Sequence, residues 1–179
     1  WIVALPGFGA RLDDFELQRF RLLAAVLDSR LLVLETPGVG GAQTTLAARE
    51  AAGLLVGSYR PLARRLLAVI DDLCGPQSSL SLIGYSLGSS VATAVAAEAS
   101  PSRVQQLTLV EPVALHRWWP WQLARASKTE DTYVDEALRE TLTVEDAILP
   151  ADRRADLSVR PGMRRRLRPS ELVLAAGLC

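Results

Sequence analysis

The sequence predicts an α/β fold, a three-layer sandwich built on a mainly parallel sheet, with a helical cap-like lobe after it. Apolar runs of strand length alternate with helical patterns over the first 110 residues, and that alternation needs crossover connections and a parallel sheet. The strand runs are mostly apolar rather than strictly alternating, as expected where helices cover both faces of a sheet. Apolar residues make up 49% of the 179 residues, enough to fill a core.

The elements follow from apolar periodicity and from turn residues. The expected strands are short apolar runs, and they cover residues 1–5, 31–34, 80–84 and 104–110. The expected helices cover about 14–27, 62–73 and 87–99. Residues 44–57 fit either a helix or a loop. Helical patterns replace strands from about 117, and no strand-like run follows until 172.

One pentapeptide predicts a nucleophilic serine. Gly84-Tyr85-Ser86-Leu87-Gly88 ends a predicted strand and opens a predicted helix, which is the context that gives a G-x-S-x-G sequence its meaning as a nucleophile elbow. The turn is so tight that the flanking positions must be small. It holds the Ser86 hydroxyl above the sheet edge, in a strained backbone conformation. The alternative is a chance pentapeptide in a sequence rich in Gly and Ser.

A second turn fits the role of an oxyanion loop beside the predicted nucleophile. An oxyanion hole in this architecture takes one N–H from the residue after the nucleophile and one from the loop after an earlier strand. Here those donors would be Leu87 and Phe8, the latter in the turn Pro6-Gly7-Phe8-Gly9. Taken alone, that turn would be an ordinary Gly/Pro loop.

These residues resemble the α/β-hydrolase family. Leu5 to Gly9 is similar to its oxyanion loop, Glu35 to Gly40 to the turn after the next strand, and 101–112 to the stretch after the nucleophile helix. The resemblance implies a hydrolase core over 1–116 and a helical cap-like or lid-like segment over 117–179. It also implies that the family's first two strands precede Trp1 and that its acid and histidine follow Cys179. We therefore expect a fragment that is nearly inactive by itself.

The base is the open question at the site. A serine nucleophile needs a base to take its proton and an acid to orient that base. His116 is the only histidine, and Glu111 lies at the end of a predicted strand. The two residues follow Ser86 in the family's chain order, but they would leave one strand end five residues apart, which fits a triad poorly. The alternative is that His116 is a hinge residue and Glu111 a packed carboxylate.

Composition limits the function classes. Twenty basic residues balance twenty acidic ones, so no net charge draws the molecule to nucleic acid or to a membrane surface. Two cysteines suit a reducing, cytoplasmic compartment. No metal-ligand spacing or dinucleotide fingerprint is present, and we expect no cofactor.

The predicted function is that of a serine hydrolase acting on a small-molecule ester, thioester or related acyl bond. Fold alone does not fix the reaction. Cofactor-free carbon–carbon hydrolysis or peroxidation on the same scaffold is one alternative, and a non-catalytic binding protein without a complete triad is another.

Overall fold

A computed structural model describes residues 1–7, 12, 14–39, 44–113, 117–123, 125 and 169–179. Its centre is a parallel sheet of four strands in the order β2-β1-β3-β4. The strands are β1 (Ile2–Leu5), β2 (Leu31–Val33), β3 (Leu80–Tyr85) and β4 (Val104–Val110). Each lies within a residue or two of its predicted span. The parallel sheet confirms the predicted α/β fold class.

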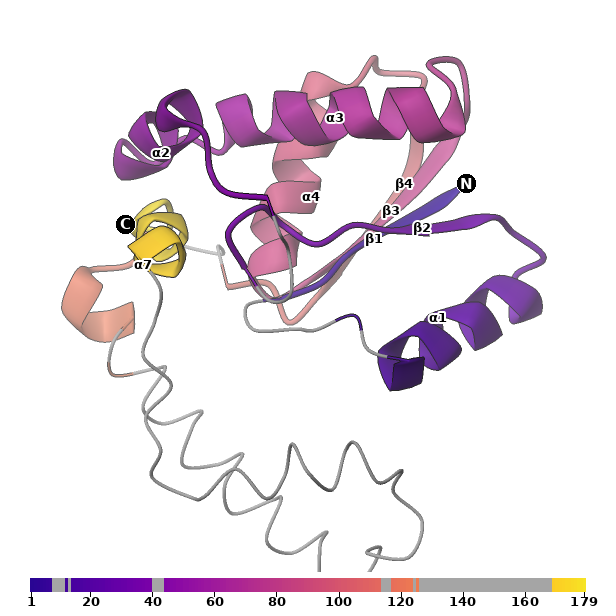
Figure 1. Cartoon of the computed structure of the whole chain (residues 1–179), viewed down its shortest axis with the longest axis horizontal. Coiled ribbons are helices and arrows are strands. Elements are labelled where there is room, and N and C mark those ends of the chain that lie inside the picture. Colours follow the sequence, from indigo (N-terminus) through magenta and orange to yellow (C-terminus); the bar gives the residue numbers. More distant parts are fainter. Residues whose placement is uncertain (8–11, 13, 40–43, 114–116, 124, 126–168) are drawn as a thin grey trace, which may run out of the picture. The chain divides into compact units, whose positions relative to one another are not determined.

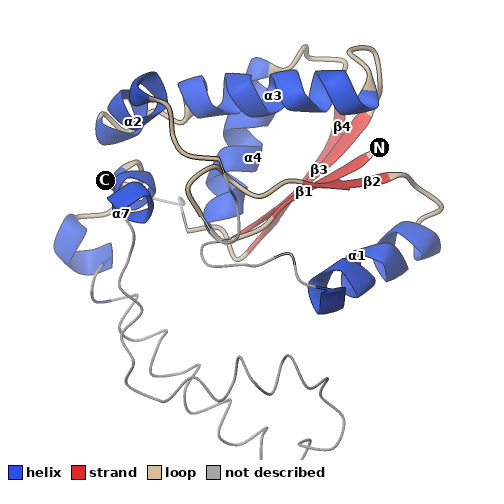
Figure 2. Ribbon diagram, viewed as in Figure 1, coloured by secondary structure: helices blue, strands red, loops and turns tan. Residues whose placement is uncertain are grey.

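The helices lie on both faces of this sheet. Helix α1 (Asp14–Val26) covers one face, and α3 (Arg60–Cys74) and α4 (Leu87–Glu98) cover the other (Figures 1 and 2). The main core lies between the sheet and the α3–α4 pair. Its fully buried side chains include Val3, Leu5, Leu62, Ile70, Leu80, Leu82, Val91 and Val95. The three layers are those that the apolar strand runs predict.

The strand order brings two distant segments together. The chain passes from β1 through α1 to β2 at one edge, and then returns to place β3 on the other side of β1. In register, Leu5 at the end of β1 pairs with Gly84 near the end of β3. Ligands of open α/β sheets bind outside the carboxyl ends of the strands where the strand order reverses in this way. Pro6-Gly7 and Ser86 follow the two strands at that point.

The structure resolves one ambiguity and corrects one expectation. The 44–57 stretch contains helix α2 (Ala48–Leu55). The apolar run from 172 is not a strand but part of helix α7 (Pro169–Ala176). Glu171, Leu174 and Leu178 are buried while Leu172 is exposed, and this spacing of three and then four residues fits one face of a helix and not of a strand. The Tyr59 hydroxyl donates to the Leu174 carbonyl at 2.9 Å, which ties α7 to the segment between α2 and α3.

The chain divides into two compact units, residues 1–117 with 168–179 and residues 118–167. In the second unit the structure describes 118–123 and 125, where Trp119 and Trp121 are exposed. The division into a core over 1–116 and a cap over 117–179 stays a prediction. No helix among the described residues is long and apolar enough to cross a membrane.

Glu98 at the end of α4 joins that helix to α3 and makes stability depend on pH. Its carboxylate accepts from Nε of Arg64 at 2.6 Å and from Nε of Arg60 at 2.5 Å. The hydrogen bond from Arg64, followed by that from Arg60 and the charges of both, lowers the pKa of Glu98. A carboxyl group whose pKa is depressed by folding stabilises the protein above its unfolded pKa, and this is lost as the pH falls through the folded value.

We therefore expect Glu98→Gln to lower the melting temperature at neutral pH. The difference from wild type should shrink as the pH falls below the unfolded glutamate pKa of about 4.3. Thermal unfolding followed by circular dichroism between neutral pH and about pH 3 measures both. A difference of constant size across that range would contradict the assignment.

Candidate active site

Ser86 occupies a strained turn between β3 and α4. Its backbone has φ 51° and ψ −120°, and it is one of three described residues other than glycine with positive φ, with Asp28 and Glu111. Residues held in such sparsely populated conformations cost about 1–3 kcal/mol and cluster at functional sites. The Ser86 N–H donates to the Val110 carbonyl at 2.9 Å, so the end of β4 holds the strained residue in place.

The glycines beside Ser86 allow two backbones to approach closely. A Cβ on Gly84 would lie 2.6 Å from the Gly88 carbonyl oxygen and 2.6 Å from Ser89 Cα. A Cβ on Gly88 would lie 2.6 Å from the Pro6 carbonyl oxygen and closer still to that of Leu5. The first turn of α4 therefore packs directly on the end of β1, which leaves no room for a side chain at either glycine.

The loop after β1 reaches Ser86 itself. Gly7 is buried, and a Cβ there would lie 3.0 Å from Ser86 Cβ and 2.9 Å from a ring carbon of Tyr85. Gly7 and Ser86 thus lie side by side, although 79 positions separate them in the chain. Ser86 is also the N-cap of α4, so the N–H groups and the positive end of that helix lie at the same place.

The comparisons with known proteins agree with this geometry. A sequence model of the alpha/beta hydrolase fold matches residues 1–166. The chain belongs to the α/β-hydrolase family. Among solved structures, MenH from S. aureus is similar in fold, with a TM-score of 0.51 and 18% sequence identity. The match covers 99% of this chain and 64% of that protein, so the chain spans less than two thirds of its length. No curated protein matches the chain.

The described residues include only some of the predicted α/β-hydrolase site. Ser86 and Leu87 lie together at the start of α4, and Leu87 is buried. Helix geometry leaves the first N–H groups of α4, that of Leu87 included, without an acceptor inside the helix. Phe8 and His116 lie outside the described residues. The roles of Ser86, Leu87 and Phe8 stay predictions.

Glu111 follows β4 directly, in a left-handed conformation with φ 48°, and its side chain is exposed. Because Glu111 is exposed, the prediction that it is a packed carboxylate is wrong. The structure leaves the pairing of Glu111 with His116 untested. Within the described residues, no three His, Cys, Asp or Glu side chains are grouped as metal ligands would be.

Sequence reasoning missed the part that Ser89 plays at this elbow. Ser89 is 1% exposed, and its hydroxyl donates to the Gly84 carbonyl at 2.8 Å and lies 3.3 Å from that of Val110. The Val110 carbonyl is the one that accepts from the Ser86 N–H. Ser89 thus links α4 to the ends of both β3 and β4. The only signal in the sequence is a serine three residues after the nucleophile, and that position alone does not predict the two carbonyl contacts.

The neighbouring Ser90 is a matched control for the contribution of the Ser89 hydroxyl to stability. Ser90 is 8% exposed, and its hydroxyl has no hydrogen-bond partner among the residues that the structure describes. We expect Ser89→Ala to lower the free energy of unfolding by about 1–2 kcal/mol, because a buried hydrogen bond is lost. Ser90→Ala should be neutral or stabilising, because it removes an unsatisfied buried polar group. Urea unfolding of the two variants measures both, and equal losses would contradict the hydrogen-bond assignment.

Proposed function

We propose that the protein is a serine hydrolase that cleaves an ester, thioester or related acyl bond of a small molecule through Ser86. The observation that carries the proposal is the strained backbone of Ser86, φ 51° and ψ −120°. The strain occurs where the strand order reverses and where Gly7 meets Ser86. Backbone strain at a nucleophile elbow holds the serine oxygen exposed above the sheet, ready to react.

In the proposed reaction, Ser86 Oγ forms a bond to the substrate carbonyl carbon while a base takes the hydroxyl proton. The carbonyl oxygen becomes negative, and the N–H groups of Leu87 and Phe8 stabilise it. The tetrahedral intermediate then breaks its bond to the leaving group, which receives the proton from the base. Water, deprotonated by the same base, hydrolyses the acyl-enzyme and restores the serine.

The proposal does not assign the base to His116. A His116→Ala variant tests whether His116 is that base. If Glu111 and His116 complete the triad, His116→Ala should lose as much activity as Ser86→Ala, because a serine and its base act as a unit. If the base is a different residue, His116→Ala should match the wild type. A Glu111→Gln variant, which keeps the size of the side chain, provides the companion measurement.

The experiment that tests the proposal has two readouts on the purified full-length protein. One is turnover of p-nitrophenyl butyrate and of a butyryl thioester, and the other is covalent labelling by a fluorophosphonate probe, each against Ser86→Ala. Turnover or labelling that Ser86→Ala removes supports a serine hydrolase. Absence of both from the full-length protein would instead favour a binding protein with the same fold.

A further inference from the structure

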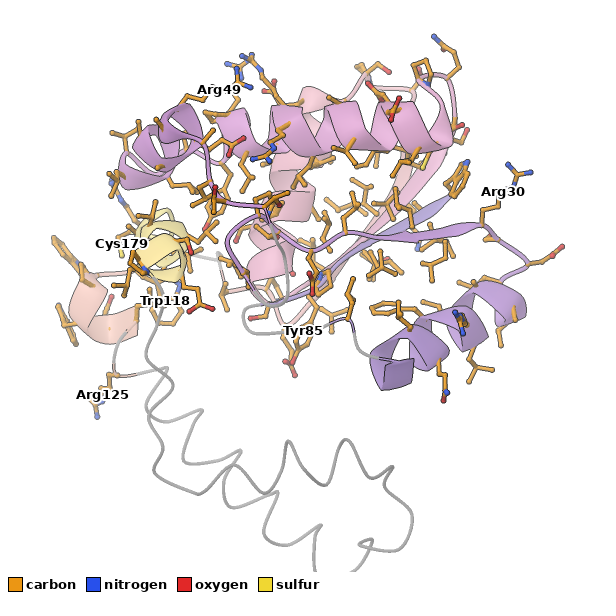
Figure 3. All side chains as sticks on the ribbon, viewed as in Figure 1. Arg30, Arg49, Tyr85, Trp118, Arg125 and Cys179 are labelled. Carbon is orange, nitrogen blue, oxygen red and sulfur yellow. The ribbon has the colours of Figure 1, made fainter. Side chains whose placement is uncertain are left out.

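Helix α7 is held to the core by residues that are far from it in the sequence. In its first turn, Ser170 Oγ donates to the Gly38 carbonyl at 2.8 Å, across 132 positions of the chain. One turn later, the Leu174 carbonyl accepts from the Tyr59 hydroxyl at 2.9 Å, across 115 positions. The helix lies against α2, on the side away from Arg49 (Figures 1 and 3). The docking of α7 is thus set by tertiary contacts.

Gly38 is the residue at which the turn after β2 meets this helix. It has φ +84°, and it lies in a turn, residues 36–39, that is buried throughout. Its N–H donates to the Thr44 carbonyl at 2.8 Å. A Cβ on Gly38 would lie 2.8 Å from Ser170 Cβ and 3.1 Å from Ser170 Oγ. The first turn of α7 therefore packs directly on the main chain of the 36–39 turn.

The 36–39 turn stands at the edge of the sheet that carries the candidate active site. Strand β2 is parallel to β1, with Val33 opposite Ala4, and β1 is parallel to β3. The chain therefore leaves all three strands at one edge, the edge at which open α/β sheets bind ligands. The Leu12 N–H, in the segment after β1, donates to Glu35 Oε1 at 3.2 Å. The segments that follow β1 and β2 are thus joined at this edge.

The hydrogen bond between Ser170 and Gly38 makes the turn and the helix depend on each other. A buried carbonyl needs a hydrogen-bond partner, and leaving it without one is costly. If α7 moved away, the Gly38 carbonyl would lose the Ser170 hydroxyl, and the turn would lose the helix that packs on it. If the turn moved, α7 would lose the contact that holds its first turn.

We propose that α7 is a latch for the 36–39 turn: docking of Ser170 on Gly38 orders the turn, and the helix and the turn open as one unit. Proteins open locally in cooperative units of this kind. In the chain α7 follows the second compact unit, residues 118–167, so the latch links the end of that segment to the edge of the sheet that carries Ser86. The proposal goes beyond the proposed function and does not depend on it.

The test perturbs the latch from each side, because coupling between two sites is reciprocal. Hydrogen-exchange mass spectrometry of the full-length protein follows the peptide that contains Gly38 and the peptides of α7. We expect Gly38→Ala to speed exchange in α7 about fivefold or more, because the added Cβ displaces Ser170. Ser170→Ala, which removes only the hydroxyl, should speed exchange in the turn by a similar factor.

Two control variants match these changes away from the latch. Gly75→Ala places alanine at φ +90°, where the nearest atom to the added Cβ is Ser78 Oγ at 3.4 Å, so it adds backbone strain without a clash. Ser102→Ala removes an exposed serine hydroxyl. Both controls should leave exchange in the turn and in α7 as in wild type.

Acceleration of both segments by each latch variant, with the controls unchanged, supports the proposal. Acceleration confined to the substituted segment would overturn it, because the helix and the turn would then open separately. Equal acceleration in β1, β3 and α4 would also overturn it, because the two would then open only with the whole core. If Gly38→Ala does not fold, Ser170→Ala decides between these outcomes. No readout uses ester turnover or labelling, so the result is independent of whether Ser86 is the nucleophile.

Discussion

Gly88→Ala is expected to destabilise the protein by about 3 kcal/mol or more. The added Cβ would lie 2.6 Å from the Pro6 carbonyl oxygen and 2.7 Å from the Leu5 carbonyl carbon. Both neighbours are main-chain atoms at or just after the end of β1, so neither can move aside as the tip of a flexible side chain can. Relief requires α4 to separate from β1, and the packing of α4 on the sheet is lost with it.

Gly57→Ala is the matched control. Gly57 has φ +76°, and a Cβ there would meet no heavy atom within 4 Å. This substitution should cost only the backbone strain of a left-handed alanine, about 1–2 kcal/mol. Urea unfolding monitored by tryptophan fluorescence gives both free energies. If Gly88→Ala costs no more than Gly57→Ala, the close approach of α4 to β1 is wrong.

Of the substitutions considered, Ser86→Ala is expected to have the largest effect on ester turnover and on fluorophosphonate labelling. Removing the hydroxyl removes the atom that forms the covalent bond, so ester turnover of the full-length protein should fall about 10³-fold or more. Fluorophosphonate labelling at this site should disappear. The free energy of unfolding should change little, because the alanine keeps the backbone and no described partner of the Ser86 hydroxyl is lost.

Ser102→Ala, in the exposed turn before β4, is the control for loss of a serine hydroxyl away from the elbow. It should turn over ester and label as wild type does. Labelling that persists in Ser86→Ala would show that the probe reacts with a different side chain. Loss of labelling in both variants would show that the effect is not specific to Ser86.

The elbow could be predicted from the sequence because its signals are local. A strand-length apolar run, two glycines four residues apart and a run of small residues lie within 20 positions of each other. Their spacing determines the turn and the helix that follows it. The 80–84 and 104–110 runs became β3 and β4 for the same reason, since short apolar runs between turn residues have few alternatives.

The remaining features depend on contacts between distant segments. No local pattern places Gly7 against Ser86, because the pairing of Leu5 with Gly84 is set by the order of strands in the sheet. Nor does a pattern give Ser89 its two carbonyl neighbours. The 172–178 run is apolar enough for either element, and burial of Glu171 and Leu174 with Leu172 exposed distinguishes the helix from a strand.

The most direct test of the central claim is the position of the probe on the protein. Fluorophosphonate-treated protein is digested, and the modified peptide is sequenced by mass spectrometry. If Ser86 is the nucleophile, one phosphonyl group will be found on Ser86, while the other serines, Ser89 and Ser90 among them, remain unmodified. A modification on any other residue, or none on Ser86 in protein that turns over ester, would contradict it.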